Sequence, residues 1–252
     1  MFSPAAFTAL YWIMTIAGVA ALVGLFTRLS IFILALGVWI FVSHAYSYGD
    51  VHHPQAVFAI FLMVLPLAPV GERLSIDALI RRRRARRSAG VPPRREILDT
   101  AMWPLKLLHV LLAMTYFSTG ITKVLAGGLA WINGYTLQNY LFSDAMTNNL
   151  PLGIWLSQQY VLCVILAVLT ILFEVFYFVS ILVPRSGPLF FVGGIFFHIG
   201  LYVTAGHPFF QHIVMNALLL FFLDRDWFPE QVRRLEALIA RLRAGAESHQ
   251  PS

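Results

Sequence analysis

The chain has 252 residues, of which 59% are hydrophobic and 12% charged, and its mean hydropathy is +0.74. Soluble domains usually contain about 45–50% apolar and about 25% charged residues. This composition therefore excludes most soluble folds, disordered chains and coiled coils, and it indicates a polytopic membrane protein. The single cysteine, Cys163, excludes an internal disulfide and a cysteine metal cluster.

Long apolar runs occur along most of the chain, and a helix needs about 20 apolar residues to cross a bilayer. We expect an all-α bundle of about seven transmembrane helices. Four of these runs are short, so we expect some spans to be tilted or embedded among neighbours. The expected spans are Ala5–Phe26, Ser30–Tyr46, Gln55–Val70, Trp103–Leu125, Gln159–Val183, Pro188–Thr204 and Phe209–Leu223.

The basic residues predict the orientation, because cytoplasmic loops are enriched in Lys and Arg. The arginine-rich run from Arg81 to Arg87 makes the loop after the third span cytoplasmic. With about seven spans, the N-terminus is then outside and the C-terminus is cytoplasmic. Every other Lys and Arg falls on the inner side except Lys123. The net charge of +6 is therefore an orientation signal and does not indicate nucleic-acid binding.

The residues after the last span form a basic tail. We predict a membrane domain over residues 5–224 and a cytoplasmic amphipathic tail over residues 225–252. Within this tail, apolar residues between Pro229 and Ala246 recur at helical spacing, with arginines mostly on the other faces. That pattern is typical of a helix that lies in the membrane interface.

Lys123 is the one cation that departs from the charge bias, and it lies near the outer end of the fourth span. It can be a lysine whose ammonium extends to the interface. It can also be a base, because an apolar pocket disfavours the charged form of lysine. Small residues just before it, including Gly120, and a polar aromatic segment after it favour a pocket.

Other polar residues lie within the spans, where they are costly and often functional. Glu174 is the only acid within a span, and His212 and Asn216 share one helical face because they are four residues apart. His198 and His44 lie in two further spans. Each can form an interhelical hydrogen bond, and Glu174 can instead act as a relay.

The segment from Gly127 to Gln158 is polar and aromatic, and it is too long for a tight turn. We expect a lid or re-entrant element over a pocket, although an interfacial aromatic belt would have similar composition. No H-x-x-x-H or E-x-x-H spacing joins two ligands on one helix, so no metal is predicted.

Two neighbouring segments carry a family resemblance. The segment from Tyr116 to Lys123, followed by Trp131 to Tyr135, resembles the Y-F-x-x-G-x-x-K…W-x-x-G-Y pattern of vitamin K-dependent γ-carboxylases. Their wider family is the horizontally transferred transmembrane (HTTM) domain proteins. Weaker similarities occur around His44, at Gly24 to Arg28, at Leu74 to Asp77, at Phe173-Glu174 and at Phe197-His198.

The resemblance implies a site that binds a reduced vitamin K or menaquinone-type quinone and deprotonates it, in an outward-facing pocket of a bacterial inner-membrane protein. In such a site Lys123 is the base and His44 lies in the same pocket, while Glu174 is a relay or structural group. Epoxidation or hydroquinone oxidation then follows. The implied substrate-binding residues are Tyr116, Phe117, Gly120, Trp131, Tyr135, His198, His212 and Asn216.

The chain also departs from the carboxylases. They carry a large lumenal domain that binds a propeptide, and this chain has only about 28 residues after Asp224. Thr122 stands where the carboxylases have a second lysine before the base. Peptide carboxylation is therefore not expected. The alternatives are a non-enzymatic membrane assembly or maturation partner, which would contact another protein, and a DoxX-like quinone oxidoreductase subunit.

Overall fold

The protein is described by a computed structural model, which places residues 3–49, 53–72, 75–87 and 102–223. Every element within these ranges is helical, which confirms the all-α prediction. The expected interfacial helix between Pro229 and Ala246 lies outside the described residues, as does His52. The helices are α1 (Pro4–Val23), α2 (Thr27–Tyr46), α3 (His53–Val64), η1 (Leu65–Leu67), α4 (Ile76–Arg87), α6 (Trp103–Gly127), η2 (Gly128–Trp131), α7 (Tyr135–Asn148), α8 (Pro151–Ser157), α9 (Tyr160–Phe176), α10 (Val179–Leu182), η3 (Pro184–Ser186), α11 (Gly187–Ala205) and α12 (Phe210–Leu223).

Seven of these elements coincide with the expected spans, but they differ in length. In the described part of the chain, four helical segments are long and apolar enough to cross a membrane: α1, α2, α6 with η2, and η3 with α11. A fifth candidate is the pair α8 and α9, which is bent by 99°. The helices α3 and α12 are apolar but shorter. The structure therefore supports a membrane protein with four or five full-length candidate spans.

Local sequence explains where several helices end. Gly24 ends α1 in the left-handed conformation, with φ 70°, which glycine adopts without steric cost. Pro66 converts the end of the third apolar run into the short 3-10 helix η1, because proline lacks the amide proton that an α-helix needs. The fifth expected span is likewise interrupted after Phe176, and α10 continues the chain.

Helix α4 is fastened to the turn between α1 and α2. The Asp77 carboxylate accepts hydrogen bonds from the backbone amides of Phe26 and Thr27 at 2.9 and 2.7 Å, and from the Thr27 hydroxyl at 2.7 Å. The backbone hydrogen bond from Thr27 is the main cause that lowers the pKa of Asp77. Gly24 contacts Ser75 so closely that a side chain there would overlap it. These contacts join two of the segments that carry a weaker resemblance to the family, the one that begins at Gly24 and the one that ends at Asp77.

The core lies where α2, α3, α6, α11 and α12 meet. Phe61, Leu108, Leu112, Phe191 and Met215 are almost completely buried in it. By contrast, α1 exposes large apolar side chains, and Leu22 is 86% exposed. Such exposure is rare on a soluble protein but is expected for a helix that faces lipid.

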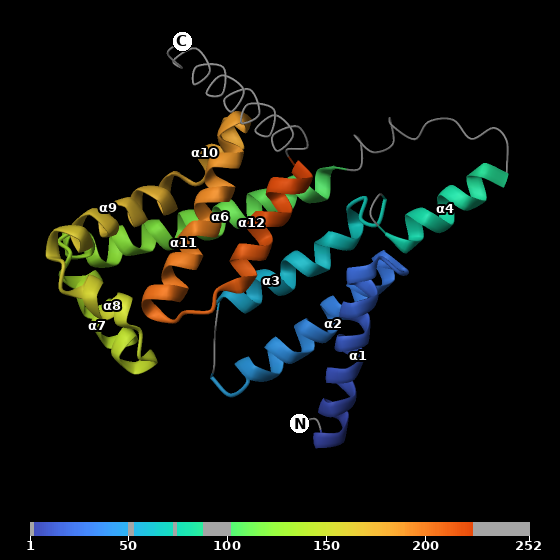
Figure 1. The fold of residues 1–252 in the computed structure, drawn as a ribbon, viewed down its shortest axis with the longest axis horizontal. Coiled ribbons are helices and arrows are strands. Elements are labelled where there is room, and N and C mark those ends of the chain that lie inside the picture. The colour runs from blue at the N-terminus through green and yellow to red at the C-terminus, as the bar shows by residue number, and fades with distance from the viewer. Residues whose placement is uncertain (1–2, 50–52, 73–74, 88–101, 224–252) are drawn as a thin grey trace, which may run out of the picture.

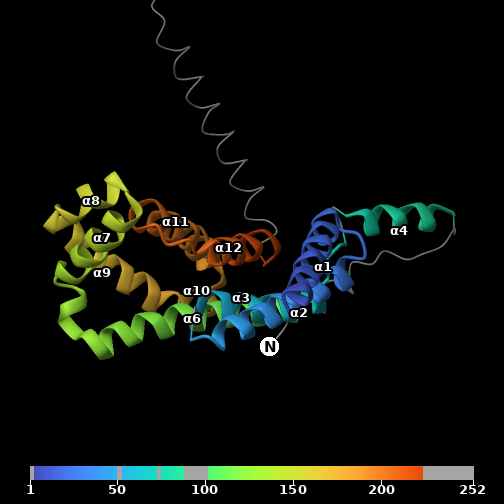
Figure 2. The ribbon, with the colours of Figure 1, turned by 90° about the horizontal axis from the view of Figure 1, so that it is seen from below.

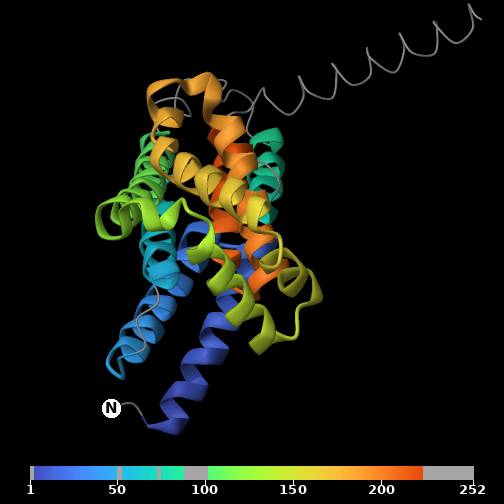
Figure 3. The same cartoon turned by 90° about the vertical axis from the view of Figure 1, so that its left-hand side faces the viewer.

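Figures 1 and 2 place α7 and α8 at one end of the molecule and α4 at the other. Figure 3 shows that α1 begins at the opposite end of the structure from α10. Helices α6 and α9 pack against each other, and α9 also contacts α7, whereas α1 packs mainly on α2. The pocket described next lies at the α7 end.

Candidate functional site

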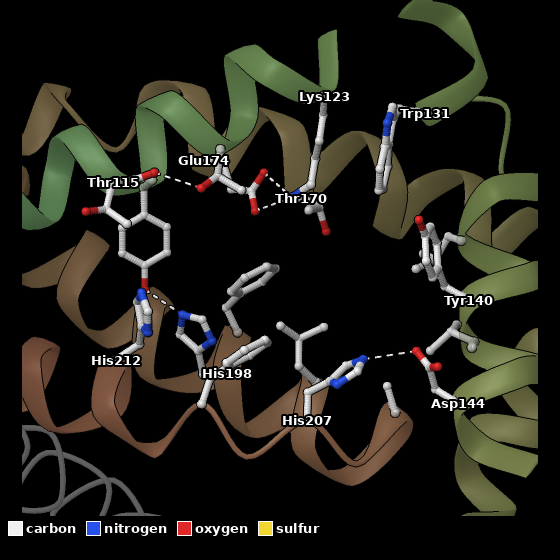
Figure 4. Close-up of a pocket in the computed structure, with 18 residues that line it drawn as sticks. Thr115, Lys123, Trp131, Tyr140, Asp144, Thr170, Glu174, His198, His207 and His212 are labelled. Atoms are coloured by element: carbon white, nitrogen blue, oxygen red, sulfur yellow. Dashed lines mark hydrogen bonds and ion pairs between the residues drawn. The ribbon is translucent and has the colours of Figure 1, made fainter. Parts of the chain in front are cut away.

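A cavity of about 420 Å³ lies where α7 meets α6, α9, α11 and α12. Helix α7 contributes four lining residues, Leu137, Tyr140, Leu141 and Asp144. This agrees with the prediction that the segment after Gly127 covers a pocket. Figure 4 shows that polar side chains enter the cavity from several helices. Its volume is within the range of about 300–1,000 Å³ that is usual for small-molecule sites.

Lys123 and Glu174 form an ion pair on one wall of this cavity. The Lys123 Nζ lies 2.5 Å from both carboxylate oxygens of Glu174. The Glu174 side chain is 4% exposed and that of Lys123 is 19% exposed, so the pair is largely removed from solvent. The lysine ammonium also lies 5.4 Å from the ring centre of Trp131, within the range of a cation–π interaction.

The packing of α6 on α9 explains this pairing. At Gly120, a Cβ atom would lie 2.9 Å from the Glu174 Cβ and from the Val175 amide nitrogen. Glycine therefore allows the two helices to approach closely beside Glu174. Side chains of an α-helix lean toward its N-terminus, so Lys123 extends back along α6 to reach the same level. The sequence placed Glu174 at mid-span or further in, and the register of the two helices brings it to the lysine.

A hydrogen-bonded network connects the cavity with the core. The Asn216 amide nitrogen donates to the Tyr116 hydroxyl at 3.0 Å, and the Tyr177 hydroxyl donates to the Asn216 oxygen at 2.6 Å. The proton of the Tyr116 hydroxyl is then available for His198 Nε2, which lies 2.9 Å away. Both tyrosine hydroxyls then have an acceptor for their protons, provided that His198 Nε2 carries no proton. That condition is met when the imidazole is neutral with its proton on Nδ1.

A second polar pair lies elsewhere on the cavity wall. His207 Nε2 is 3.0 Å from Asp144 Oδ2, and the two side chains are 45% and 26% exposed. Asp144 comes from α7, whereas His207 lies in the connection between α11 and α12. This pair is more exposed to solvent than Lys123 and Glu174.

The structure brings six of the predicted site residues to the cavity: Lys123, Glu174, Tyr116, Trp131, His198 and His212. Asn216 lies directly behind them through its bond to Tyr116. Three others have different surroundings. Gly120 packs on α9, Phe117 contacts Phe178, and Tyr135 is 64% exposed beside Tyr160.

His44 does not lie in this cavity. It borders a separate, shallow depression between α1 and α2, where its ring is 4.9 Å from that of Phe7 and 5.1 Å from that of Tyr48. The reason is that α1 and α2 pack as a pair away from the α7 end of the bundle. The structure therefore separates the two residues that the resemblance placed in one pocket.

Sequence reasoning did not select Asp144, His207 or Tyr140 as site residues. A signal for Asp144 was present, because it is the only acid between Lys123 and Glu174. The sequence places His207 at the same outer level as Lys123, whereas Tyr140 had no comparable signal, since aromatic residues make up 14% of this chain. Among the described residues, no group of three metal-ligating side chains is positioned to hold an ion.

A family profile described as HTTM domain matches residues 1–227, which is nearly the whole chain. The chain belongs to the HTTM domain family. No curated protein matches it, and no solved structure matches it. Membership of this family agrees with the apolar helices and supports a membrane protein.

Proposed function

We propose that this HTTM-domain protein binds a hydroquinone-type lipid in the cavity and removes its phenolic proton with Lys123, which acts together with Glu174. The observation that carries the proposal is a buried lysine–glutamate pair on the wall of a ligand-sized cavity. Aromatic side chains, including Trp131 and Phe197, supply walls that suit a planar ring.

The charge of the pair suits this reaction. Lys123 and Glu174 together hold one ionisable proton, wherever between the amine and the carboxylate it resides, and their net charge is then zero. After they accept a phenolic proton, Lys123 is an ammonium, Glu174 is a carboxylic acid, and the net charge is +1. That positive charge faces the oxygen that lost the proton, and a low-dielectric site strengthens the attraction.

The residues that line the cavity can supply the charge and the hydrogen bonds that a hydroquinone needs. A phenol has an ordinary pKa of about 10, so a site that stabilises its anion must supply a nearby positive charge. Lys123 supplies that charge, and the Tyr116–His198 network gives a second hydrogen-bonding surface. The bound hydroquinone would supply the reducing electrons, and oxidation by dioxygen, as in an epoxidase, is what the family resemblance implies.

The proposed topology has seven spans, with the N-terminus and the cavity outside, the C-terminus cytoplasmic, and a bacterial inner membrane as the location. It is supported by charge: Arg28 and Lys106 lie in the first turns of α2 and α6. Arg81 to Arg84 lie in α4 and Arg185 in η3, and none of these basic residues lines the cavity. Single-cysteine labelling in intact cells, after Cys163→Ala, tests this arrangement. The Ser47→Cys variant should react with an impermeant maleimide, and the Arg185→Cys variant should not.

The catalytic proposal is tested by turnover of reduced menaquinone in air-saturated detergent. Lys123→Met should lower turnover by about a hundredfold or more, since positioned proton transfer contributes about 10²–10⁴ in rate. Lys106→Met is the matched control, because Lys106 is an exposed lysine on the same helix outside the cavity. Unchanged turnover in Lys123→Met would refute the base. Wild-type protein that neither binds nor oxidises the hydroquinone would favour the assembly-partner alternative.

A further inference from the structure

The cavity has a polar pair at each of two separated places on its wall. Figure 4 shows Lys123 and Glu174 on one side and Asp144 and His207 on another, with open space between them. The first pair is nearly buried and the second is partly exposed. We call these the inner pair and the outer pair.

The surface between the two pairs is aromatic and aliphatic. Trp131 and Tyr140 stack with ring centres 5.9 Å apart and an interplanar angle of 15°. Phe197, Leu201 and Phe209 line the same cavity. A wholly apolar ligand would cover both polar pairs without hydrogen-bonding to them, which is costly. The walls therefore suit a flat ring with a polar atom at each of two opposite edges.

We infer that the outer pair, Asp144 and His207, is a positioning and specificity-determining element that binds the second oxygen of a 1,4-dihydroxyaromatic ligand. This inference rests on the proposed function, which assigns the first hydroxyl to the inner pair. His207 bonds Asp144 Oδ2, and a carboxylate has a second oxygen with capacity to accept a hydroxyl proton. His207 in turn orients the carboxylate.

The outer pair is held in place by contacts behind it. The Asn148 side chain donates to the Ala205 carbonyl at 3.1 Å, which ties α7 to the end of α11, two residues before His207. Gly206, with φ 79°, is approached so closely by Asn148 that a Cβ would lie 2.7 Å from its side chain. The outer pair therefore has a fixed position relative to α7.

The test compares two ligands that differ by one hydroxyl, 1,4-dihydroxynaphthalene and 1-naphthol, under anaerobic conditions. Wild-type protein in detergent should bind the diol about tenfold more tightly, which is the gain expected for one hydrogen bond to a charged group. Asp144→Asn should bring the ratio of the two dissociation constants close to one, while its affinity for 1-naphthol stays within about twofold.

Asn139→Ala is the matched control, because Asn139 is an exposed residue of the same helix and lies outside the cavity. It should keep the preference for the diol, and loss of the preference in this variant would contradict the assignment of that preference to Asp144. Equal binding of the two ligands to wild-type protein would also overturn the inference, whether or not Asp144→Asn folds.

Failure of the proposed function gives a different result. In that case neither ligand binds, or Lys123→Met binds both as tightly as wild-type protein. If only the inference fails, 1-naphthol still binds in a manner that depends on Lys123, but the diol has no advantage.

Discussion

The Lys123–Glu174 pair makes a quantitative prediction about stability. In Glu174→Gln, the Lys123 ammonium stays in the largely buried wall of the cavity but loses the carboxylate with which it pairs. Removing one partner of a buried ion pair typically costs about 3–5 kcal/mol. We expect the lower limit, about 3 kcal/mol, because the Lys123 side chain is 19% exposed and has a route to water. In Lys123→Met, Glu174 can become neutral by protonation, so the cost should be smaller.

The double variant Lys123→Met/Glu174→Gln separates the interaction energy of the two side chains from the effect that each substitution has by itself. It leaves no unpaired charge, so its unfolding free energy should lie closer to the wild-type value than that of Glu174→Gln does. A coupling energy of about 1–3 kcal/mol is expected from the double-mutant cycle. Unfolding in detergent, followed by tryptophan fluorescence against denaturant, measures all four proteins. A coupling energy below about 0.5 kcal/mol would mean that the two residues act independently, and it would refute the buried pair.

Three further predictions concern other contacts. Gly120→Ala should destabilise the protein by about 1–3 kcal/mol, because the new Cβ would press on Glu174 and Val175 and separate α6 from α9. Asn216→Leu should cost about 1–3 kcal/mol, because it removes the hydrogen-bond partner of two buried tyrosine hydroxyls. Asp77→Asn should lower stability at neutral pH. That loss should fade in acid: the folded-state pKa of Asp77 is lowered, so its contribution is complete above the unfolded value of about 3.9 and is lost as pH falls through the folded value.

Each of these predictions has its own control or contrary result. Gly18→Ala places a Cβ where nothing lies within 4 Å, so it should leave stability unchanged or slightly raised. Tryptophan fluorescence is the readout for the glycine and asparagine variants, and equal effects of Gly18→Ala and Gly120→Ala would contradict the close helix contact. For Asp77, thermal shifts of both proteins from pH 3 to pH 7 are compared. A difference that grows in acid would contradict the assigned hydrogen bonds.

The positions of the apolar helices could be predicted from the sequence because they depend on local properties. A run of apolar residues forms a helix in lipid wherever it stands, since its backbone must satisfy its own hydrogen bonds. The four full-length candidates, α1, α2, α6 and α11, therefore start and end close to where hydropathy placed them. Lys123 was also identifiable, because a lone cation against the charge bias is visible without coordinates.

The partners of Lys123 were decided only by the tertiary structure. Glu174 is 51 residues away, and it meets the lysine because Gly120 sets the close approach and register of α6 and α9. His44 seemed an equal candidate from its segment, but the packing of α1 on α2 holds it in another depression. The pair of Asp144 and His207 spans 63 residues and forms where α7 meets the turn after α11. Long apolar runs determine which residues form helices, whereas close contacts between those helices decide which polar groups share a cavity.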